Sequence, residues 1–199
     1  AVTNTSLDNY VRTTFYEPLQ MMSTTFKPRE RYTLNNIVPT ELEKHFRQQL
    51  IHGDVHDEGA AMFGGVAGHA GLFSNAYDLA QLYQLLLNGG ELNGKRLLEK
   101  TTIEKFTAYN SDISRRGLGF DKPEKDNATR KEAYPSKSVS SETFGHTGFT
   151  GICVWVDPQY KLIYIFLSNR VTPTRNNNKL GQLNVRPNIQ EAIYSAIIQ

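Results

Sequence analysis

The stretch FGHTGFTGICVWVDPQYKLIYIFL, residues 144–167, carries the clearest secondary-structure pattern in this chain. Residues 151–156 and 162–167 are rich in β-branched and aromatic side chains, which favour strands. Residues 157–161 separate the two runs by the length of a hairpin turn. The sequence therefore predicts an antiparallel hairpin, with the glycine-rich segment 144–151 just before its first strand.

Helical patterns surround this hairpin. Apolar residues recur at helical spacing in four segments, which are residues 5–17, the segment from Ser74 or Asn75 to Asn88-Gly89-Gly90, residues 97–106, and residues 189–197. A further short helix is predicted over residues 40–50, because Thr40 and Glu43 have the spacing of a capping box. Helices in the middle of the chain, a hairpin after them and a terminal helix predict an α+β fold in a single domain.

Two long segments lack this periodicity. Residues 18–40 contain three prolines, so an irregular connection is expected there. Residues 110–140 are polar, and they predict a mobile surface excursion with one strand near residues 117–120. Within this excursion the pair Arg115-Arg116 is interpreted as part of a solvated face.

The composition limits the function classes. Apolar residues make up 39% of the chain and charged residues 21%, a balance typical of globular proteins. The net charge of +2 is too small to favour nucleic acid or a membrane surface as a partner. No run approaches the length of a bilayer-spanning segment, and the single Cys153 excludes an internal disulfide.

Polar residues and a glycine run cluster between residues 52 and 71. One hypothesis for the cluster is a metal-assisted hydrolase, and the candidate ligands are His52, Asp54, His56, Asp57, Glu58 and His69. No complete zinc-ligand spacing is present, so structural hydrogen bonding is favoured and we expect no metal and no cofactor. The glycine run 64–71 lacks the ending of a phosphate-binding loop, and its glycines indicate backbone conformations that other residues cannot reach.

The segment 144–151 resembles the third active-site motif of the serine β-lactamase and penicillin-binding-protein family, which usually contains Lys-Thr-Gly. His146-Thr147-Gly148 stands in that place here, and several relatives in the family also carry His instead of Lys. Other stretches resemble family segments in the same order along the chain, and they are residues 15–21, residues 64–80, Asp157-Pro158 and residues 167–170. The resemblance, which is to the class C type, covers nearly the whole chain. It implies a β-lactamase/transpeptidase-like α+β fold with a helical region, an antiparallel sheet and a C-terminal helix.

This resemblance implies roles for four residues. Gly148 would leave space for substrate beside an edge strand, and Thr147 would offer its hydroxyl to a substrate carboxylate or carbonyl. The backbone N–H of Phe149 would be one of two oxyanion donors. His146, unlike a lysine, is expected to be mostly uncharged near neutral pH, so the parent protein is expected to be a poor β-lactamase and to prefer uncharged esters, or peptides whose recognition does not depend on a carboxylate. The alternative interpretation is a glycine-bounded turn with a surface histidine.

Two motifs of the family are not found. No serine in this chain is followed by lysine three positions later, and no Tyr-x-Asn or Ser-x-Asn loop precedes the first helix. We therefore expect residues 1–199 to be the C-terminal portion of a single β-lactamase-like domain, with Ser-x-x-Lys upstream. The resemblance then implies a parent serine hydrolase that acts on an ester, amide or β-lactam, while this chain alone is inactive. The alternative is a non-catalytic binding module for cell-wall fragments or a partner.

The resemblance also implies partners and a location. It predicts a small-molecule or peptidoglycan-like substrate and a periplasmic or otherwise extracytoplasmic protein. Residues 38–58 are similar to those of β-lactamase-like domains that follow a β-N-acetylhexosaminidase, which implies an upstream glycoside hydrolase domain in the parent chain. If the N-terminal strands of the family's sheet are missing, a sheet edge is exposed, and this predicts a homodimer through that edge.

Overall fold

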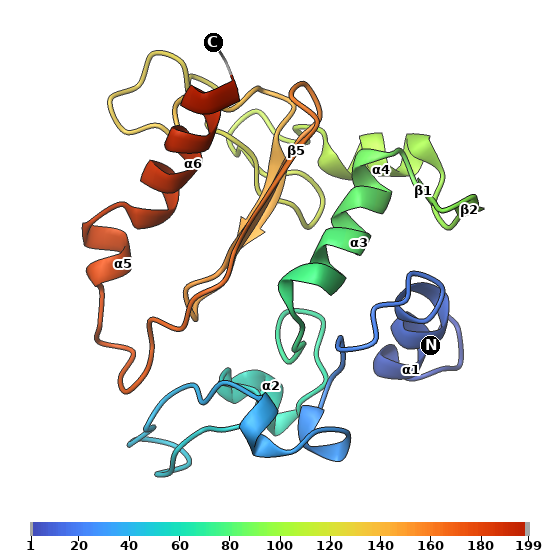
Figure 1. The fold of residues 1–199 in the computed structure, drawn as a ribbon, viewed down its shortest axis with the longest axis vertical. Helices are drawn as coiled ribbons and strands as arrows, with labels where there is room; N and C mark the ends of the chain where they lie inside the picture. The colour runs from blue at the N-terminus through green and yellow to red at the C-terminus, as the bar shows by residue number, and fades with distance from the viewer. Residues whose placement is uncertain (1, 198–199) are drawn as a thin grey trace. The chain divides into compact units, whose positions relative to one another are not determined.

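The computed structural model of the protein describes residues 2–197 (Figure 1). They form two compact units, of which the first runs up to Leu82 and also includes Asn169–Asn177. The second unit comprises Tyr83–Ser168 and the chain from Asn178 onward. Helix α3 (Ala76–Leu87) begins in the first unit and ends in the second.

The capping signals predicted for α3 are confirmed. The side chain of Asn75 accepts a hydrogen bond from the N–H of Asp78 at 2.8 Å. Beyond the last turn, Gly89 and Gly90 take positive φ angles of 70° and 94°, which end the helix. The carboxylate of Asp78 is buried and accepts from the N–H of Ser23 at 2.7 Å, so it attaches the start of α3 to the preceding connection.

The first unit is built from short helices and irregular chain. Helix α1 (Leu7–Val11) continues as a π-helical segment (Arg12–Tyr16), which confirms the helix predicted over residues 5–17. The predicted irregular connection is also confirmed, and it holds only two 3₁₀ turns, Pro28–Glu30 and Leu34–Asn36. Helix α2 (Glu58–Met62) is capped by Asp57, whose side chain accepts from the N–H of Ala60 at 2.7 Å.

The helix predicted over residues 40–50 is wrong. The carboxylate of Glu43 does not reach back to Thr40; it accepts hydrogen bonds from the backbone N–H groups of His45, Phe46, Arg47 and Gln48. Thr40 instead pairs with Ile51, and its N–H lies 2.7 Å from the carbonyl oxygen of Ile51. The chain therefore forms a closed loop, in which Leu42, Phe46 and Leu50 remain exposed.

The loop is organised by one charged group. Desolvation raises the pKa of Glu43, but the four backbone N–H donors outweigh it and lower the pKa to about 2. A carboxylate that satisfies consecutive N–H groups competes directly with helical hydrogen bonding, and here it prevails.

The second unit contains the sheet. A two-residue hairpin, β1 (Glu91–Leu92) and β2 (Lys95–Arg96), leads to α4 (Lys100–Thr107), which confirms the helix predicted over residues 97–106. Strands β3 (Phe144–Thr147), β4 (Cys153–Asp157) and β5 (Leu162–Phe166) form an antiparallel sheet in the order β3-β4-β5. The predicted hairpin and the predicted α+β fold are thereby confirmed.

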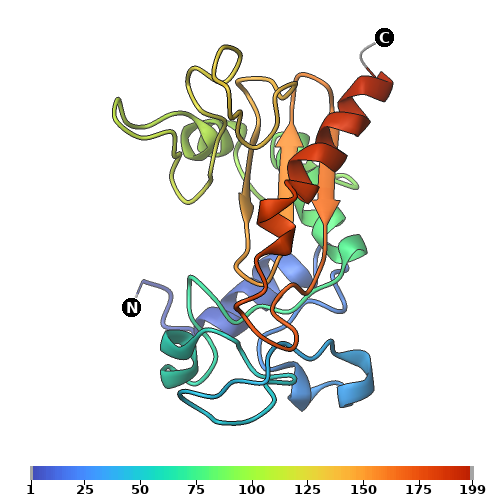
Figure 2. The same ribbon diagram turned by 90° about the vertical axis from the view of Figure 1, so that its left-hand side faces the viewer.

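The terminal helix covers one face of this sheet. After the short α5 (Lys179–Gln182), helix α6 (Val185–Ile197) lies along the sheet, as Figures 1 and 2 both show. Cys153, Trp155 and Tyr164 form the buried cluster between the layers, and Ile193 of α6 packs against it. At the end of α6 the hydroxyl of Tyr194 donates to the buried carboxylate of Asp157 at 2.6 Å.

The excursion predicted over residues 110–140 is only partly correct. No strand forms at residues 117–120, and Asp121, Lys122 and Pro123 are buried rather than on the surface. Asp121 makes a single antiparallel bridge with Gly145, with N–H to carbonyl distances of 2.7 and 3.0 Å. Burial lowers the pKa of Lys122 to about 8, and its ammonium donates to the carbonyl of Thr143 at 3.0 Å. The segment is therefore part of the packed second unit.

Within residues 2–197, none of the helices has both the length and the apolar character needed to cross a bilayer.

The glycine run offers a matched test of why its glycines are required. A Cβ on Gly71, where φ is +112°, would lie 2.3 Å from the carbonyl oxygen of Gly65. At Gly64 φ is also positive, at +73°, but nothing lies within 4 Å of the added atom. We expect Gly71→Ala to cost about 3 kcal/mol or more and Gly64→Ala only about 1 kcal/mol, measured by urea unfolding. Equal losses would show that φ alone, rather than the close backbone approach, limits this loop.

Candidate functional site

The four candidate residues lie at the end of β3 and in the turn that follows it. His146 pairs with Val154 and Thr147 with Cys153, so both lie on β3, which is an edge strand of the three-stranded sheet. Gly148 follows directly, and the side chain of Phe149 is exposed. The sequence prediction of an edge strand at this segment is therefore confirmed, while the catalytic roles remain predictions.

The glycines on either side of His146 allow close backbone approaches. A Cβ on Gly145 would lie 2.0 Å from the carbonyl oxygen of Val154, so only glycine fits between Asp121 and β4. A Cβ on Gly148 would lie 2.5 Å from Cγ1 of Ile152. The N–H of Gly148 donates to the carbonyl of Ile152 at 2.8 Å, which fixes the turn that presents Phe149.

The hydrogen bonds of His146 determine its protonation state. Its Nδ1 lies 2.7 Å from the carbonyl oxygen of Thr147, and its Nε2 lies 2.9 Å from Nη1 of Arg116. A carbonyl oxygen can only accept and a guanidinium can only donate. Nδ1 therefore carries the proton, Nε2 accepts from Arg116, and the imidazole is neutral in this arrangement.

A buried carboxylate lies behind this pair. Asp121 is 1% exposed and binds Arg115 through both oxygens, with Nε to Oδ1 at 2.8 Å and Nη2 to Oδ2 at 3.1 Å. Tyr134 donates its hydroxyl to Oδ2 at 2.8 Å, and Nη2 of Arg116 lies 3.8 Å from the same oxygen. Burial would raise the pKa of Asp121, but these hydrogen bonds and the two arginine charges outweigh it and hold the pKa below its usual value.

The interpretation of Arg115-Arg116 as a solvated face is wrong for Arg115. Its guanidinium also binds Glu124 at 2.8 Å and lies 4.3 Å from the centre of the Tyr134 ring. Tyr134 in turn donates its hydroxyl to Oδ2 of Asp121. Arg115, Tyr134 and Asp121 therefore form one network, and the backbone of Asp121 bridges it to Gly145 of β3.

Sequence reasoning missed Asp121, Tyr134 and both arginines as parts of this arrangement. The charges were visible in the sequence, but they lie in a segment without periodicity. Such a segment indicates no face toward which its side chains point.

The polar cluster at residues 52–69 separates into local pairs. His56 binds Glu41 at 2.8 Å, His69 binds Asp57 at 3.1 Å, and Nε2 of His52 lies 2.6 Å from the carbonyl oxygen of Ile37. Among the described residues no group of three or more His, Cys, Asp or Glu side chains is arranged to hold a metal ion.

Glu41 also anchors the segment that returns to the first unit near the end of the chain. Its carboxylate accepts from Nε of Arg175 at 2.8 Å, and Nη2 of Arg175 binds Glu58 at 2.7 Å. Desolvation raises the pKa of Glu41, but the hydrogen bonds from Arg175 and His56 prevail and lower it. These ion pairs and hydrogen bonds therefore hold Glu41, the start of α2 and the segment around Arg175 together within the first unit.

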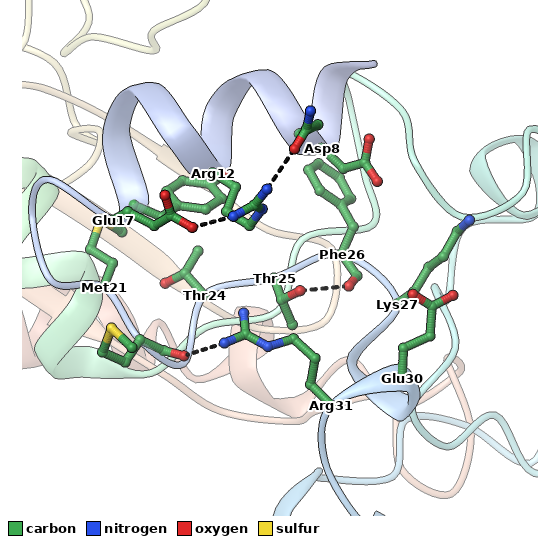
Figure 3. A pocket seen from close by; sticks show the side chains of 13 residues that line it. Asp8, Arg12, Glu17, Met21, Thr24, Thr25, Phe26, Lys27, Glu30 and Arg31 are labelled. Carbon is green, nitrogen blue, oxygen red and sulfur yellow. Dashed lines mark hydrogen bonds and ion pairs between the residues drawn. The ribbon is translucent and has the colours of Figure 1, made fainter. Parts of the chain in front are cut away.

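The first unit also contains two hollows. The larger, of about 410 Å³, is lined by α1, the π-helical segment and residues 21–31, and charged side chains of both signs face it (Figure 3). Arg12 binds Glu17 and Asn9 there, so its charge is already compensated. The smaller hollow, of about 290 Å³, is bordered by Lys27, Arg47 and four glycines of the segment 53–71.

The buried Asp121 offers a test of what holds the motif strand in place. We expect Asp121→Asn to cost about 3 kcal/mol in urea unfolding, because the substitution removes the buried negative charge that Arg115 and Tyr134 bind. The matched control is Asp126→Asn, since Asp126 is exposed and lies 3.5 Å from Arg130; its expected cost is below about 0.5 kcal/mol. Similar small losses for both variants would show that the network contributes little.

Comparison with known proteins agrees with the predicted family and fold. The sequence matches the family model described as Beta-lactamase over residues 1–185. Two relatives named putative D-alanyl-D-alanine carboxypeptidase, from Salmonella enteritidis and Salmonella typhi, are 36% identical to it over 201 residues. The match covers 95% of this chain and 45% of each relative, so the chain spans about half the length of the curated relatives it matches.

Solved structures show the same fold at low sequence identity. A β-lactamase from Mycobacterium bovis superposes with a TM-score of 0.60 at 18% identity, covering 96% of this chain and 57% of its own. Simvastatin synthase from Aspergillus terreus superposes with a TM-score of 0.62 at 17% identity, covering 99% of this chain and 51% of its own. With the family model matched over most of its length, this chain belongs to the β-lactamase family.

Proposed function

We propose that the complete protein containing this chain is a serine hydrolase that acts on an ester, amide or β-lactam through an acyl-enzyme. The observation that carries this proposal is His146-Thr147-Gly148 at the end of an edge strand in a chain of the β-lactamase family. The names of the Salmonella relatives support peptidoglycan-like peptides as the substrate class and an extracytoplasmic location.

The proposed reaction assigns each motif residue a task. The serine oxygen attacks the carbonyl carbon, and negative charge develops on the carbonyl oxygen. The N–H of Phe149 and the N–H of the serine stabilise that oxyanion, a contribution that in other enzymes is worth about 100-fold or more in rate. Thr147 orients the substrate through its hydroxyl, and the leaving group departs before water hydrolyses the acyl-enzyme.

The nucleophile would come from the part of the curated relatives that this chain does not match. No serine of the 199 residues is followed by lysine three positions later, so none is paired with the base that the family uses. We therefore propose that residues 1–199 are the C-terminal portion of a single β-lactamase-like domain. The second candidate function is a non-catalytic binding module, favoured by the same missing motif.

Covalent labelling separates these two functions. We expect a fluorescent penicillin or a fluorophosphonate to label one serine of the complete protein in a one-to-one ratio, and to leave the isolated 199-residue chain unlabelled. Mass spectrometry of the labelled peptide would identify the serine. A complete protein that binds peptidoglycan fragments but never becomes labelled would support the binding module, and a labelled serine within these residues would contradict the fragment proposal.

We also propose that the isolated chain pairs with a second copy through the outer edge of β5. Within the described residues β5 has β4 as its sole strand partner, so the backbone groups of its other edge are available to a further strand. Multi-angle light scattering of the isolated chain is expected to give a concentration-dependent dimer. A monomer at every concentration tested would contradict this pairing. An upstream glycoside hydrolase domain in the complete protein is a further part of the proposal.

A further inference from the structure

The smaller hollow of the first unit brings together two positive side chains from separate parts of the chain. Lys27 lies in the connection after the first helical segment, and Arg47 lies in the loop that Glu43 organises. Much of the remaining wall has no side chains, because it is formed by glycines at positive φ, which are Gly53, Gly64, Gly65 and Gly71. Glycine backbone and two cations therefore line this hollow.

The guanidinium of Arg47 has no carboxylate partner among residues 2–197. Its Nη1 and Nη2 donate to the carbonyl oxygens of Val55 and His56, both at 2.6 Å, and these acceptors carry only partial charges. The carboxylate of Glu43 binds the backbone N–H of Arg47 and not its guanidinium. Nε of Arg47 is buried and has no hydrogen-bond partner in the protein. Buried donors are rarely left unsatisfied, so this N–H points to an acceptor supplied by a ligand.

The ammonium of Lys27 also forms no ion pair in the described part of the chain. Lys27 borders the larger hollow as well, and no hydrogen bond joins it to the other side chains drawn there (Figure 3). Of the groups that affect the pKa of Asp8, Lys27 has the smallest effect, so that carboxylate compensates its charge only weakly. The stem of Lys27 lies beside Gly65, since a Cβ on Gly65 would be 3.9 Å from its Cγ. Its ammonium can therefore reach the smaller hollow along this wall.

The charges around the smaller hollow add up to an excess of positive charge. Asp54 is the sole carboxylate among the described residues that border it. Nη1 of Arg29 binds Asp54 at 2.9 Å, so this negative charge is already paired. The charges of Lys27 and Arg47 remain uncompensated, and a dianion gains more from two such charges than a monoanion of the same shape. The hollow is therefore suited to a doubly charged anion.

We propose that the smaller hollow binds a phosphate monoester, and that Lys27 and Arg47 hold its phosphate group. A phosphate monoester carries nearly two negative charges at pH 8, because its second pKa is about 6. A guanidinium has five N–H donors, and carbonyl oxygens use two of those of Arg47, so donors remain for phosphate oxygens. The hollow of about 290 Å³ is much larger than the roughly 30 Å³ of a water molecule, so it has room for the phosphate and an organic substituent.

This site is unlike a phosphate-binding loop, which the sequence of residues 64–71 argues against. The N–H groups of Gly64 and Gly65 already donate to the carbonyl oxygens of Ala61 and Ala60, so side-chain cations rather than consecutive backbone donors hold the phosphate. None of residues 144–149 borders the hollow. The proposal therefore goes beyond the hydrolase function and does not rest on it.

The test is a titration of the complete protein with phenyl phosphate and with phenyl sulfate at pH 8, measured by isothermal titration calorimetry. The two probes have nearly the same shape, but the sulfate ester carries one negative charge and the phosphate ester nearly two. We expect phenyl phosphate to bind at least about fivefold more tightly, and to lose affinity as the salt concentration rises. Equal affinities of the two esters, or no binding of phenyl phosphate, would overturn the proposal.

A matched pair of lysine variants locates the binding in the hollow. Lys27→Gln removes a charge from an exposed side chain and should weaken the binding of phenyl phosphate at least about tenfold. Lys44→Gln is the control, because Lys44 is an exposed lysine of the loop that contains Arg47 and does not border the hollow. It should leave the affinity within about twofold. Equal losses in the two variants would show binding to surface charge in general and would also overturn the proposal.

Arg47 requires two variants, because its bonds to carbonyl oxygens also support the loop. Arg47→Lys keeps the charge and should retain more affinity for phenyl phosphate than Arg47→Gln. A folded Arg47→Gln variant that binds phenyl phosphate as tightly as the wild type would contradict the proposal. If this variant does not fold, the comparison of Lys27→Gln with Lys44→Gln decides. Penicillin labelling of the complete protein is a separate measurement, so the hydrolase proposal and the phosphate site can fail independently.

Discussion

The second unit depends on the requirement that the buried carboxylate of Asp121 be paired. A charge that is 1% exposed needs hydrogen bonds and an opposite charge, and Arg115 and Tyr134 provide them. The same residue pairs its backbone with Gly145 on the outer edge of β3, one position before His146. Asp121 therefore connects the packing of the polar excursion to the position of the motif strand, and Arg116 reaches His146 from within that arrangement.

In the first unit, where regular secondary structure is sparse, carboxylates accept hydrogen bonds from backbone N–H groups. Glu43 accepts four consecutive backbone N–H groups, Asp57 caps α2, and Asp78 binds the N–H of Ser23. Glu41 joins His56 to Arg175, which lies 134 positions further along the chain. In a region with few helices and no paired strands beyond isolated bridges among its described residues, these side chains satisfy the backbone groups that a sheet or helix would otherwise satisfy.

The sequence predictions were accurate where the local sequence pattern for a helix or strand was strong. The hairpin at residues 151–167 and α3 were predicted well, because strand composition and capping residues act over a few positions. The segment 40–50 shows the limit of this reasoning. Its capping-box pattern favoured a helix, but in the structure the carboxylate of Glu43 accepts from several backbone N–H groups of a loop, which the backbone pairing of Thr40 with Ile51 closes.

The sequence by itself determined the order of helices and strands, the glycines that permit close approach, and the resemblance to the β-lactamase family, which the family model matches over residues 1–185. These features depend on residues that are neighbours in the chain, so their spacing carries the information. Only the tertiary structure decided which polar side chains meet, because Arg116 and His146 are 30 positions apart and Arg175 and Glu41 are 134 apart. Ion pairs and side-chain hydrogen bonds act through space, and a polar segment such as residues 110–140 contains no periodicity that would indicate its partners.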